Sequence, residues 1–131
     1  MKNPFKPGDI KIYTKVVTPE ETATFDAGEV HPVYATFALG RDAEWACRLF
    51  VLEMKEDHEE GIGTFLYVDH HAPAVIGSEV VIESILESVE GNHVIAAYKA
   101  KVGERLIASG RTGQKIVRKE KLNQLFNTLS R

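Results

Sequence analysis

Four strand-like segments follow one another with almost no chain between them, and this restricts the fold more than any other feature. The predicted strands are Ile62–Ala72, Glu79–Val89, His93–Val102 and Leu106–Val117. Each is alternating or continuously apolar and is bounded by turn-forming residues, as strands of a packed sheet are. The linkers between them are short and contain glycine, proline and asparagine. Strands joined in this way pair as antiparallel neighbours, so we expect one antiparallel sheet.

A long helix is predicted ahead of these strands, from Thr36 to about Lys55. Apolar residues recur at helical spacing on one face, and these are Ala35, Ala38, Leu39, Ala43, Ala46, Leu49 and Phe50. Trp45 and Val51 add apolar surface elsewhere on the cylinder, which is typical of a helix wrapped by other structure. A curved antiparallel sheet supplies such a surface. We therefore predict an α+β domain in which the sheet folds around one central helix.

Shorter elements are predicted nearer the two ends of the chain. Residues 10–17 alternate between apolar and polar side chains, which indicates a half-buried strand. Thr18 followed by Pro19 predicts the start of a helix, which must be short because Gly28 and Pro32 follow. Leucine and phenylalanine at helical spacing predict an amphipathic helix over Lys119–Arg131.

Composition limits the classes of protein to which this chain can belong. Its 131 residues are expected to form a single domain, residues 1–131. A net charge of −3 gives no support for a general nucleic-acid binder, which normally carries a basic excess. The single cysteine, Cys47, excludes a disulfide within the chain and a zinc site of several cysteines. No secretory or membrane-spanning segment is visible, so we expect a cytoplasmic protein without a membrane partner.

Several short motifs, in this order, resemble the hot-dog-fold acyl-CoA thioesterases, most closely the fluoroacetyl-CoA thioesterase family. They are Val33-Tyr34-Ala35-Thr36, Glu44-Trp45-Ala46-Cys47, Gly63-Thr64 with Val68-Asp69-His70, Ser88-Val89-Glu90-Gly91 and Ile107-Ala108-Ser109-Gly110. The resemblance implies the hot-dog fold, with the antiparallel sheet wrapped around the long helix. It implies hydrolysis of a small acyl-CoA thioester to the free acid and CoA. It also implies a homodimer with active sites at the subunit interface and no metal or cofactor, since CoA is part of the substrate.

The resemblance further implies roles for individual residues. Thr36, Glu44 and His70 would form the catalytic group. Glu44 would activate water or attack the thioester directly, while His70 would assist protonation of the leaving thiol. Gly63 would lie beside the thioester, and Thr64 would follow it in the substrate-binding segment.

The resemblance leaves the acyl group open. Fluoroacetate-specific members carry a phenylalanine in a lid segment just before the helix, but here the segment Phe25–His31 is shorter and its only phenylalanine lies far upstream. Arg111, with Lys115 and Arg118, is a candidate for binding the CoA phosphates because these residues lie near the last strand. The carrier, CoA or an acyl-carrier protein, also stays open.

Two of the three catalytic candidates have ordinary structural interpretations on the helix. Glu44 has Arg41 and Arg48 at i−3 and i+4, a spacing at which it could be a solvated acid with weak ion pairs. Thr36 could be the N-cap of the helix. A cap hydroxyl also lies near helix N–H groups that can stabilise an oxyanion, so the two roles are compatible.

The histidine pair and the cysteine have similar alternatives. His70 could be a hydrogen-bonded structural residue, although its ordinary pKa also suits proton transfer near neutral pH. Adjacent strand residues face opposite sides, so His71 is expected to point away from any site that contains His70. Cys47 is expected to face the interior and to serve in packing rather than as a nucleophile.

Two other functions are compatible with the same pattern. One is a non-catalytic hot-dog protein that binds acyl-CoA or another small ligand. The other is a hydratase or dehydratase of an enoyl or hydroxyacyl thioester, which needs an aspartate and a histidine side by side. Asp69 and His70 are strand neighbours and are expected to face opposite sides.

The predicted homodimer has a physical argument of its own. The strand Ile62–Ala72 is long, apolar and free of proline. As an exposed edge it would invite aggregation, whereas pairing with the same strand of a second chain would bury it.

Overall fold

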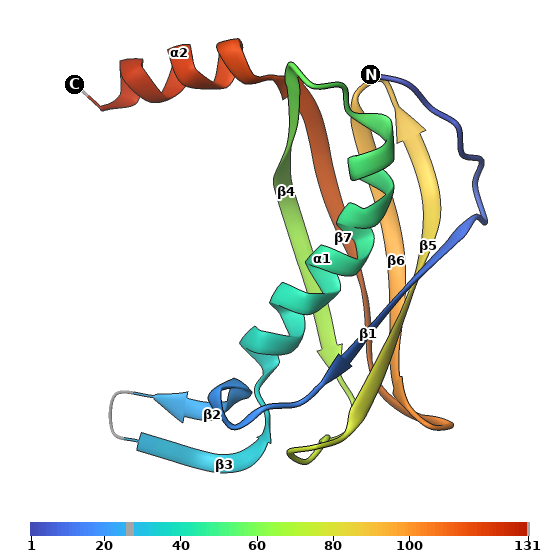
Figure 1. Cartoon of the computed structure of the whole chain (residues 1–131), viewed down its shortest axis with the longest axis vertical. Helices are drawn as coiled ribbons and strands as arrows, with labels where there is room; N and C mark the ends of the chain where they lie inside the picture. Colours follow the sequence, from blue (N-terminus) through green and yellow to red (C-terminus); the bar gives the residue numbers. More distant parts are fainter. Residues whose placement is uncertain (26–27, 131) are drawn as a thin grey trace.

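Five strands form one antiparallel sheet, and a long helix lies across one face of it (Figure 1). The computed structural model describes residues 1–25 and 28–130. The strands occur in the order β1-β5-β6-β7-β4 across the sheet. These elements are β1 (Ile10–Val16), α1 (Thr36–Met54), β4 (Glu59–His70), β5 (Glu79–Glu90), β6 (His93–Val102) and β7 (Arg105–Arg118). The prediction of an antiparallel α+β domain is confirmed.

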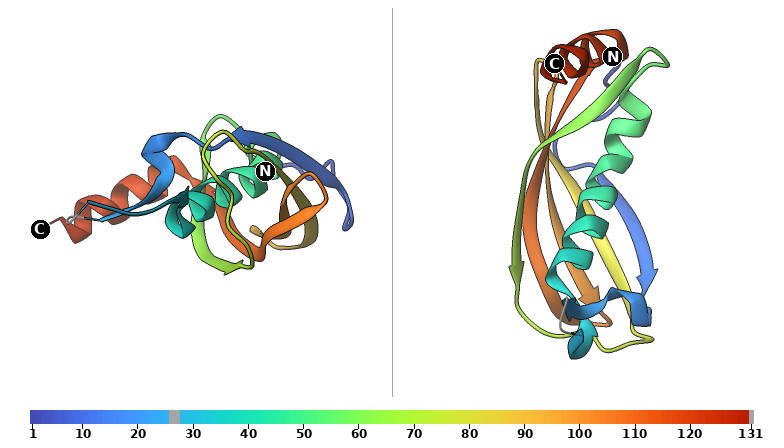
Figure 2. Two further views of the ribbon diagram at one scale, coloured as in Figure 1. Left: turned by 90° about the horizontal axis from the view of Figure 1, so that it is seen from below. Right: turned by 90° about the vertical axis from the view of Figure 1, so that its left-hand side faces the viewer.

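The hydrophobic core lies between α1 and the inner face of the sheet. Leu39, Ala43 and Phe50 of the helix are fully buried, as are Ile82 and Ile107 of the strands. The sheet curves past the helix without enclosing it, as the side view shows (Figure 2). The exposed side of α1 carries three large apolar side chains, Phe37, Trp45 and Leu52. The sheet therefore packs around α1 as predicted, while one side of the helix stays exposed in the single chain.

Strand β1 is half-buried as predicted, but its lysine-bearing face is the one turned inward. Ile10 and Ile12 are 52% and 60% exposed, whereas Tyr13 packs against the core. Lys11 forms an ion pair with Glu53 of α1. Lysine can cover apolar surface with its stem while its charged end stays paired or hydrated. Alternation alone therefore predicted the strand but not which face is buried.

A two-stranded hairpin occupies the region expected to hold only a short helix. Its elements are η1 (Pro19–Glu21), β2 (Thr22–Phe25) and β3 (Gly28–Tyr34). The predicted helix start is present, because Thr18 and Glu21 form a capping box, but it lasts for one 3-10 turn. Pro32 lies inside β3, where each strand of a hairpin has an unpaired side that needs no N–H donor. The segment Phe25–His31 belongs to this hairpin, and its residues 26 and 27 lie outside the described residues.

Strand β4 forms one edge of the sheet, with β7 as its neighbour. A register shift between Gly63 and Phe65 marks a bulge. After it, Leu66 and Val68 face α1, where they lie closest to the position that a side chain at Gly40 would occupy. Tyr67 is on the outer face by strand alternation. The bulge therefore decides which residues of β4 can reach the helix.

The last element, α2 (Lys119–Leu129), continues directly from β7 and projects past the β4 edge (Figure 1). None of its residues is buried. The prediction of an amphipathic C-terminal helix is confirmed, with its end at Leu129. No helix in the described part of the chain combines the length and apolarity needed to cross a bilayer.

Candidate active site

The candidate site lies along the seam where α1 passes β4. Thr36, Gly40 and Glu44 are spaced at i, i+4 and i+8 on the helix, so they lie in one row on the same face. Gly40 allows the strand to come close, because a Cβ atom there would lie 3.2 Å from Leu66 Cδ2. The predicted residues Thr36 and Glu44 thus share a surface with β4, which carries Gly63 and His70.

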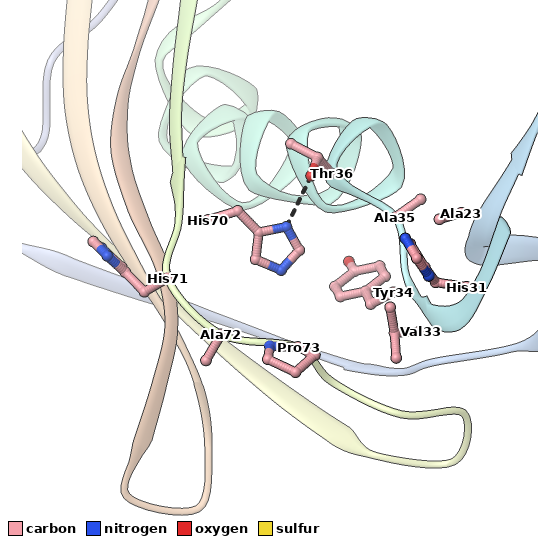
Figure 3. Close-up of a pocket in the computed structure, with 10 residues that line it drawn as sticks. All are labelled: Ala23, His31, Val33, Tyr34, Ala35, Thr36, His70, His71, Ala72 and Pro73. Atoms are coloured by element: carbon pink, nitrogen blue, oxygen red, sulfur yellow. Dashed lines mark hydrogen bonds between the residues drawn. The ribbon is translucent and has the colours of Figure 1, made fainter.

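Thr36 and His70 are in direct contact at one end of this seam. Thr36 Oγ1 lies 2.9 Å from His70 Nδ1, a hydrogen-bond distance. Figure 3 shows the His70 ring turned toward Thr36, with His71 pointing away. His71 instead contacts Ser109, with 2.9 Å between Nε2 and Oγ. The two histidines therefore point to opposite sides of β4, as expected.

Thr36 is not the N-cap of the helix, so that interpretation was wrong. The N-cap is Ala35, which has no capping side chain, and Thr36 is the first helical residue. Its hydroxyl is used for the contact with His70. The Thr36 hydroxyl therefore contacts β4 across the seam and does not cap the helix.

The His70 ring is partly enclosed, and this affects its protonation. Burial lowers the pKa of His70, an effect that the backbone of Ala72 opposes and that the neighbouring His71 strengthens. Its Nε2 atom is buried without a hydrogen-bond partner of normal geometry among the described residues. A neutral imidazole whose Nδ1 accepts from Thr36 carries its proton on Nε2. That arrangement makes Nε2 the donor atom of the ring.

Glu44 lies further along the seam, beside Gly63. A Cβ atom at Gly63 would be 3.6 Å from Glu44 Oε1, an ordinary van der Waals contact, so the carboxylate lies against the strand at this residue. The alternative interpretation of Glu44, as an acid in weak ion pairs with Arg41 and Arg48, is wrong about those ion pairs. Arg41 contacts Glu21 and Asp42, and Arg48 contacts Glu60 and the Gly61 carbonyl. Among the described residues, neither arginine forms an ion pair with Glu44.

The two halves of the predicted catalytic group are separated along the helix. Eight residues of α-helix rise by about 12 Å, and this is the axial distance from Thr36 to Glu44. The side chains of both residues are directed toward β4, since each meets a residue of that strand. A thioester bound midway along the seam, beside Gly40, would therefore lie between the Thr36–His70 pair and Glu44.

An apolar cavity of about 640 Å³ opens at the Thr36 end of the seam. Phe37, Leu66 and Val68 provide its apolar wall, and Ala23 of the hairpin lines the same cavity. A neighbouring hollow of about 330 Å³ contains His70, Tyr34 and Pro73, and Figure 3 shows this second space. A pocket lined mainly by apolar side chains with a few convergent polar groups is typical of a small-molecule site.

Thr64 and Arg111, the other two predicted substrate-binding residues, lie away from the seam within one chain. Thr64 Oγ1 lies 2.9 Å from His93 Nε2, on the side of the sheet where Gly113 faces. Arg111 alternates with Thr112, which hydrogen-bonds to Cys47 of the helix, so Arg111 lies on the outer face. There it forms a two-pronged ion pair with Glu87. Within one subunit both residues are on the far side of the sheet from Glu44.

A buried polar network, which the sequence did not reveal, fixes the start of α1 against the hairpin. The Tyr34 hydroxyl donates to Asp42, and Arg41 Nη2 contacts Glu21 Oε2 at 2.7 Å. Lys15 of β1 also pairs with Glu21. Asp42 is, with Glu53, one of two acids on a helix face that is otherwise apolar, and a buried acid requires partners. The acid at position 42 was therefore the feature of the sequence that could have indicated this network.

The remaining reactive or metal-binding groups lie elsewhere or are unreactive. Burial raises the pKa of Cys47 to about 11, although a hydrogen bond with Thr112 opposes the shift, so the thiol stays protonated and packs in the core. Glu56, His58 and Glu59 have ligand atoms within 4.8 Å of one another. They follow the C-terminal end of α1, opposite the Thr36 end of the seam, and Glu59 pairs with the N-terminal amine at 2.8 Å.

Comparison with known proteins gives consistent results. Residues 17–120 match the model of the fluoroacetyl-CoA-specific thioesterase family. A Thermus thermophilus hypothetical protein, described as a thioesterase superfamily member, is 40% identical, with a TM-score of 0.92 over 97% of this chain and 94% of that chain. No curated protein sequence matches the chain.

Two further structures support the same fold. A fluoroacetyl-CoA thioesterase is 27% identical, with a TM-score of 0.87 over 95% of this chain and 96% of that one. Mutants of that enzyme have been solved with acetyl-CoA and with fluoroacetate and CoA. A hot-dog-like protein from Thermanaerovibrio acidaminovorans, 22% identical, has a TM-score of 0.84 over 93% of this chain and 90% of that chain. The predicted hot-dog fold is confirmed.

Proposed function

Because this chain belongs to the fluoroacetyl-CoA-specific thioesterase family and is therefore an acyl-CoA thioesterase, we propose that Thr36, Glu44 and His70 carry out the hydrolysis. The observation that supports this assignment is the 2.9 Å contact between Thr36 Oγ1 and His70 Nδ1 beside an apolar cavity. In the tautomer set by that contact, Nε2 of His70 carries the ring proton and makes no hydrogen bond of normal geometry with the described residues. A substrate atom is the natural acceptor for such a donor.

Glu44 acts as the general base in this proposal. Its carboxylate takes a proton from water as the water oxygen attacks the thioester carbon. The carbon–sulfur bond then breaks, and the Nε2–H of His70 donates a hydrogen bond to the departing sulfur. The proton held by Glu44 passes to that sulfur, which yields the free acid and the thiol. Thr36 holds the His70 ring in the tautomer that this step requires.

The substrate would lie along the seam with its acyl group in the apolar cavity. Gly40 and Gly63 support this placement, because each removes a side chain where the substrate must pass close to the helix or the strand. The cavity wall contains Phe37, Leu66 and Val68, which favours a small apolar acyl group. The mutants of the similar enzyme that were solved with acetyl-CoA and with CoA support CoA as the carrier.

We further propose that the protein is a homodimer formed through β4. This strand is 12 residues long, and Leu66 and Tyr67 on its two faces are both exposed. Phe37 of α1 is exposed beside the same seam. A second copy paired with the β4 edge would cover these side chains and remove the open edge. Light scattering should give twice the chain mass, and a monodisperse monomer would contradict the dimer but not the reaction.

A thiol-release screen over a panel of acyl-CoAs tests the catalytic assignment. Glu44→Gln keeps the size of the side chain and removes the base, so turnover should fall by at least about a hundredfold. Glu53→Gln is the matched control, because Glu53 is an acid of the same helix that pairs with Lys11 outside the seam. Wild-type turnover in a folded Glu44→Gln protein would overturn the role of Glu44. Tight binding of CoA without thiol release in the wild type would favour a binding protein instead.

A further inference from the structure

Helix α2 has an apolar stripe that nothing in the described part of the chain covers. Leu125, Phe126 and Leu129 are 50%, 49% and 71% exposed. Its first residue is held by a hydrogen bond from the Lys119 N–H to the His58 carbonyl, at 2.9 Å. An 11-residue helix is too short to be stable alone in water, where helices below about 12–15 residues are marginal. Its stripe therefore requires a surface that the described residues of one chain do not supply.

Two parts of the molecule project beyond the β4 edge, one at each end of the sheet. Helix α2 leaves from one end, next to the start of β4, and the β2–β3 hairpin leaves from the other end (Figure 1). Seen along the length of the sheet, the two extend in the same direction (Figure 2). The space between them borders the β4 strand, which is the edge proposed above to pair with a second copy.

The symmetry of that pairing determines where α2 goes. When one strand pairs antiparallel with its own copy, the two-fold axis is perpendicular to the sheet and exchanges its two ends. The axis carries α2 of one copy to the end of the sheet at which the hairpin of the other copy lies. Since both elements project across the boundary between the copies, they meet there. We propose that the apolar stripe of α2 packs against the β2–β3 hairpin of a second copy of this chain, an inference that rests on the dimer proposed above.

The size of the contact also favours this arrangement. A stable interface buries about 800 Å² on each partner and involves roughly 20–30 residues a side. Strand β4 has 12 residues, half of which point toward the outer face. The projecting helix and the hairpin extend the contact at both ends of the strand. They also bury the three apolar side chains that otherwise remain in water.

The contact has a consequence for the active site. Ala23 and His31 of the hairpin line the cavity that Thr36 and Leu66 also line. A helix packed on the outside of the hairpin would hold this wall in place. Each subunit would then stabilise the acyl-binding wall of the other, so substrate binding in one subunit would depend on the C-terminal helix of its partner.

Cross-linking between engineered cysteines tests the contact. Cys47→Ala removes the only cysteine, after which Phe126→Cys is introduced together with Pro32→Cys, at an exposed position of β3 on the face opposite His31. A short bismaleimide should then give a band of dimer mass on a denaturing gel. Either substitution alone should leave monomer mass, because the two α2 helices lie at opposite ends of the dimer. Gln124→Cys, on the other side of α2, is the matched control for Phe126→Cys and should cross-link more slowly.

The kinetic test separates this inference from the reaction itself. Leu125→Asp with Phe126→Asp should raise the KM for acyl-CoA roughly tenfold, whereas Gln124→Asp should leave KM unchanged. A double-cysteine protein that is dimeric by light scattering, hydrolyses acyl-CoA and yields monomer mass after cross-linking would overturn the inference and leave the proposed function intact. An active wild-type monomer would overturn the inference and the dimer together.

Discussion

The hydroxyl of Thr36 and the ring of His70 are joined at 2.9 Å across 34 positions of sequence. The first residue of α1 and the last residue of β4 therefore meet at one point. The contact fixes the ring by its Nδ1 atom and leaves Nε2 for the substrate. Thr36 acts on the chemistry through His70, so its removal should affect the orientation and tautomer of the ring more than the binding of substrate.

Replacing Thr36 with valine should lower kcat by up to about a hundredfold, because a misplaced catalytic group costs that much. The shape of the side chain is kept, so KM should change little. Thr36→Ser restores a hydroxyl and should recover most of the activity, which a purely steric role for Thr36 would not predict. Steady-state thiol release for the two variants measures both effects. Equal activity of the valine and serine variants would contradict the positioning role.

Activity should fall in mild acid because His70 must be neutral. Burial lowers the pKa of His70 from its ordinary value of 6.5, so the neutral form persists to a pH below that value. The acid limb of the kcat/KM profile should therefore have its midpoint below 6.5. The profile is measured with substrates of different acyl groups, which should give the same midpoint. A midpoint above the ordinary histidine value would contradict this prediction.

The lowered pKa of His70 also predicts how the free energy of unfolding depends on pH. Above the ordinary histidine pKa the ring is neutral in both the folded and unfolded states and contributes nothing. As pH falls, the unfolded chain binds a proton that the folded protein does not, so the free energy of unfolding decreases. His70→Gln should lose less stability than the wild type between pH 7 and pH 5, approximately the range over which an ordinary histidine titrates. Urea unfolding at several pH values measures the difference.

Glu21 should make the fold sensitive to stronger acid. Although burial opposes it, the contacts with Lys15 and Thr18 lower the pKa of Glu21 from 4.5 to about 2. The folded pKa is depressed, so the stabilisation is complete above the unfolded value and is lost as pH falls from 4.5 toward about 2. Glu21→Gln should reduce the free energy of unfolding at neutral pH by about 3 kcal/mol, as the loss of one partner of a buried ion pair does. Glu20→Gln, on an exposed neighbour, should have almost no effect.

Much of this fold could be predicted because its signals are local. The strands β5, β6 and β7 have regular apolar patterns and turns rich in glycine, and their observed limits lie within one residue of the predicted ones. The hairpin was missed because Gly28 and Pro32 interrupt strand patterns in general, and they are tolerated here only because a two-stranded ribbon has free edges. The inward face of β1 was not predictable either, since it depends on an ion pair between Lys11 and Glu53 of another element.

In the candidate site, too, the sequence predicted local structure but not the contacts between elements. Spacing alone placed Thr36 and Glu44 on one helix, and alternation placed His70 and His71 on opposite faces. The partner of each residue is set by tertiary packing. Arg41 was expected beside Glu44, but it pairs with Glu21 and Asp42. Distances between elements that are far apart in sequence cannot be obtained from periodicity, which is why the ion pair of Arg111 with Glu87 was not predicted.

The close contact between α1 and β4 at Gly40 should determine which acyl groups are accepted. In Gly40→Ala the added methyl group would lie 3.2 Å from Leu66 Cδ2 and 3.5 Å from Val68 Cγ2, so it would narrow the apolar cavity. The helix itself should tolerate the change, because alanine is favoured over glycine by about 1 kcal/mol in a helix. The ratio of kcat/KM for hexanoyl-CoA to that for acetyl-CoA should therefore fall by roughly tenfold, the scale of discrimination in apolar pockets.

Leu66→Ala provides the opposite change in the same cavity. It removes the side chain nearest to the new methyl group, so alone it should raise the ratio for the longer acyl group. In the Leu66→Ala background, Gly40→Ala should lower the ratio by less than it does in the wild-type protein, because residues in contact are energetically coupled. Additive effects in the double variant would show that Gly40 and Leu66 do not line one acyl pocket. Thermal unfolding of each variant separates a change in specificity from a loss of folded protein.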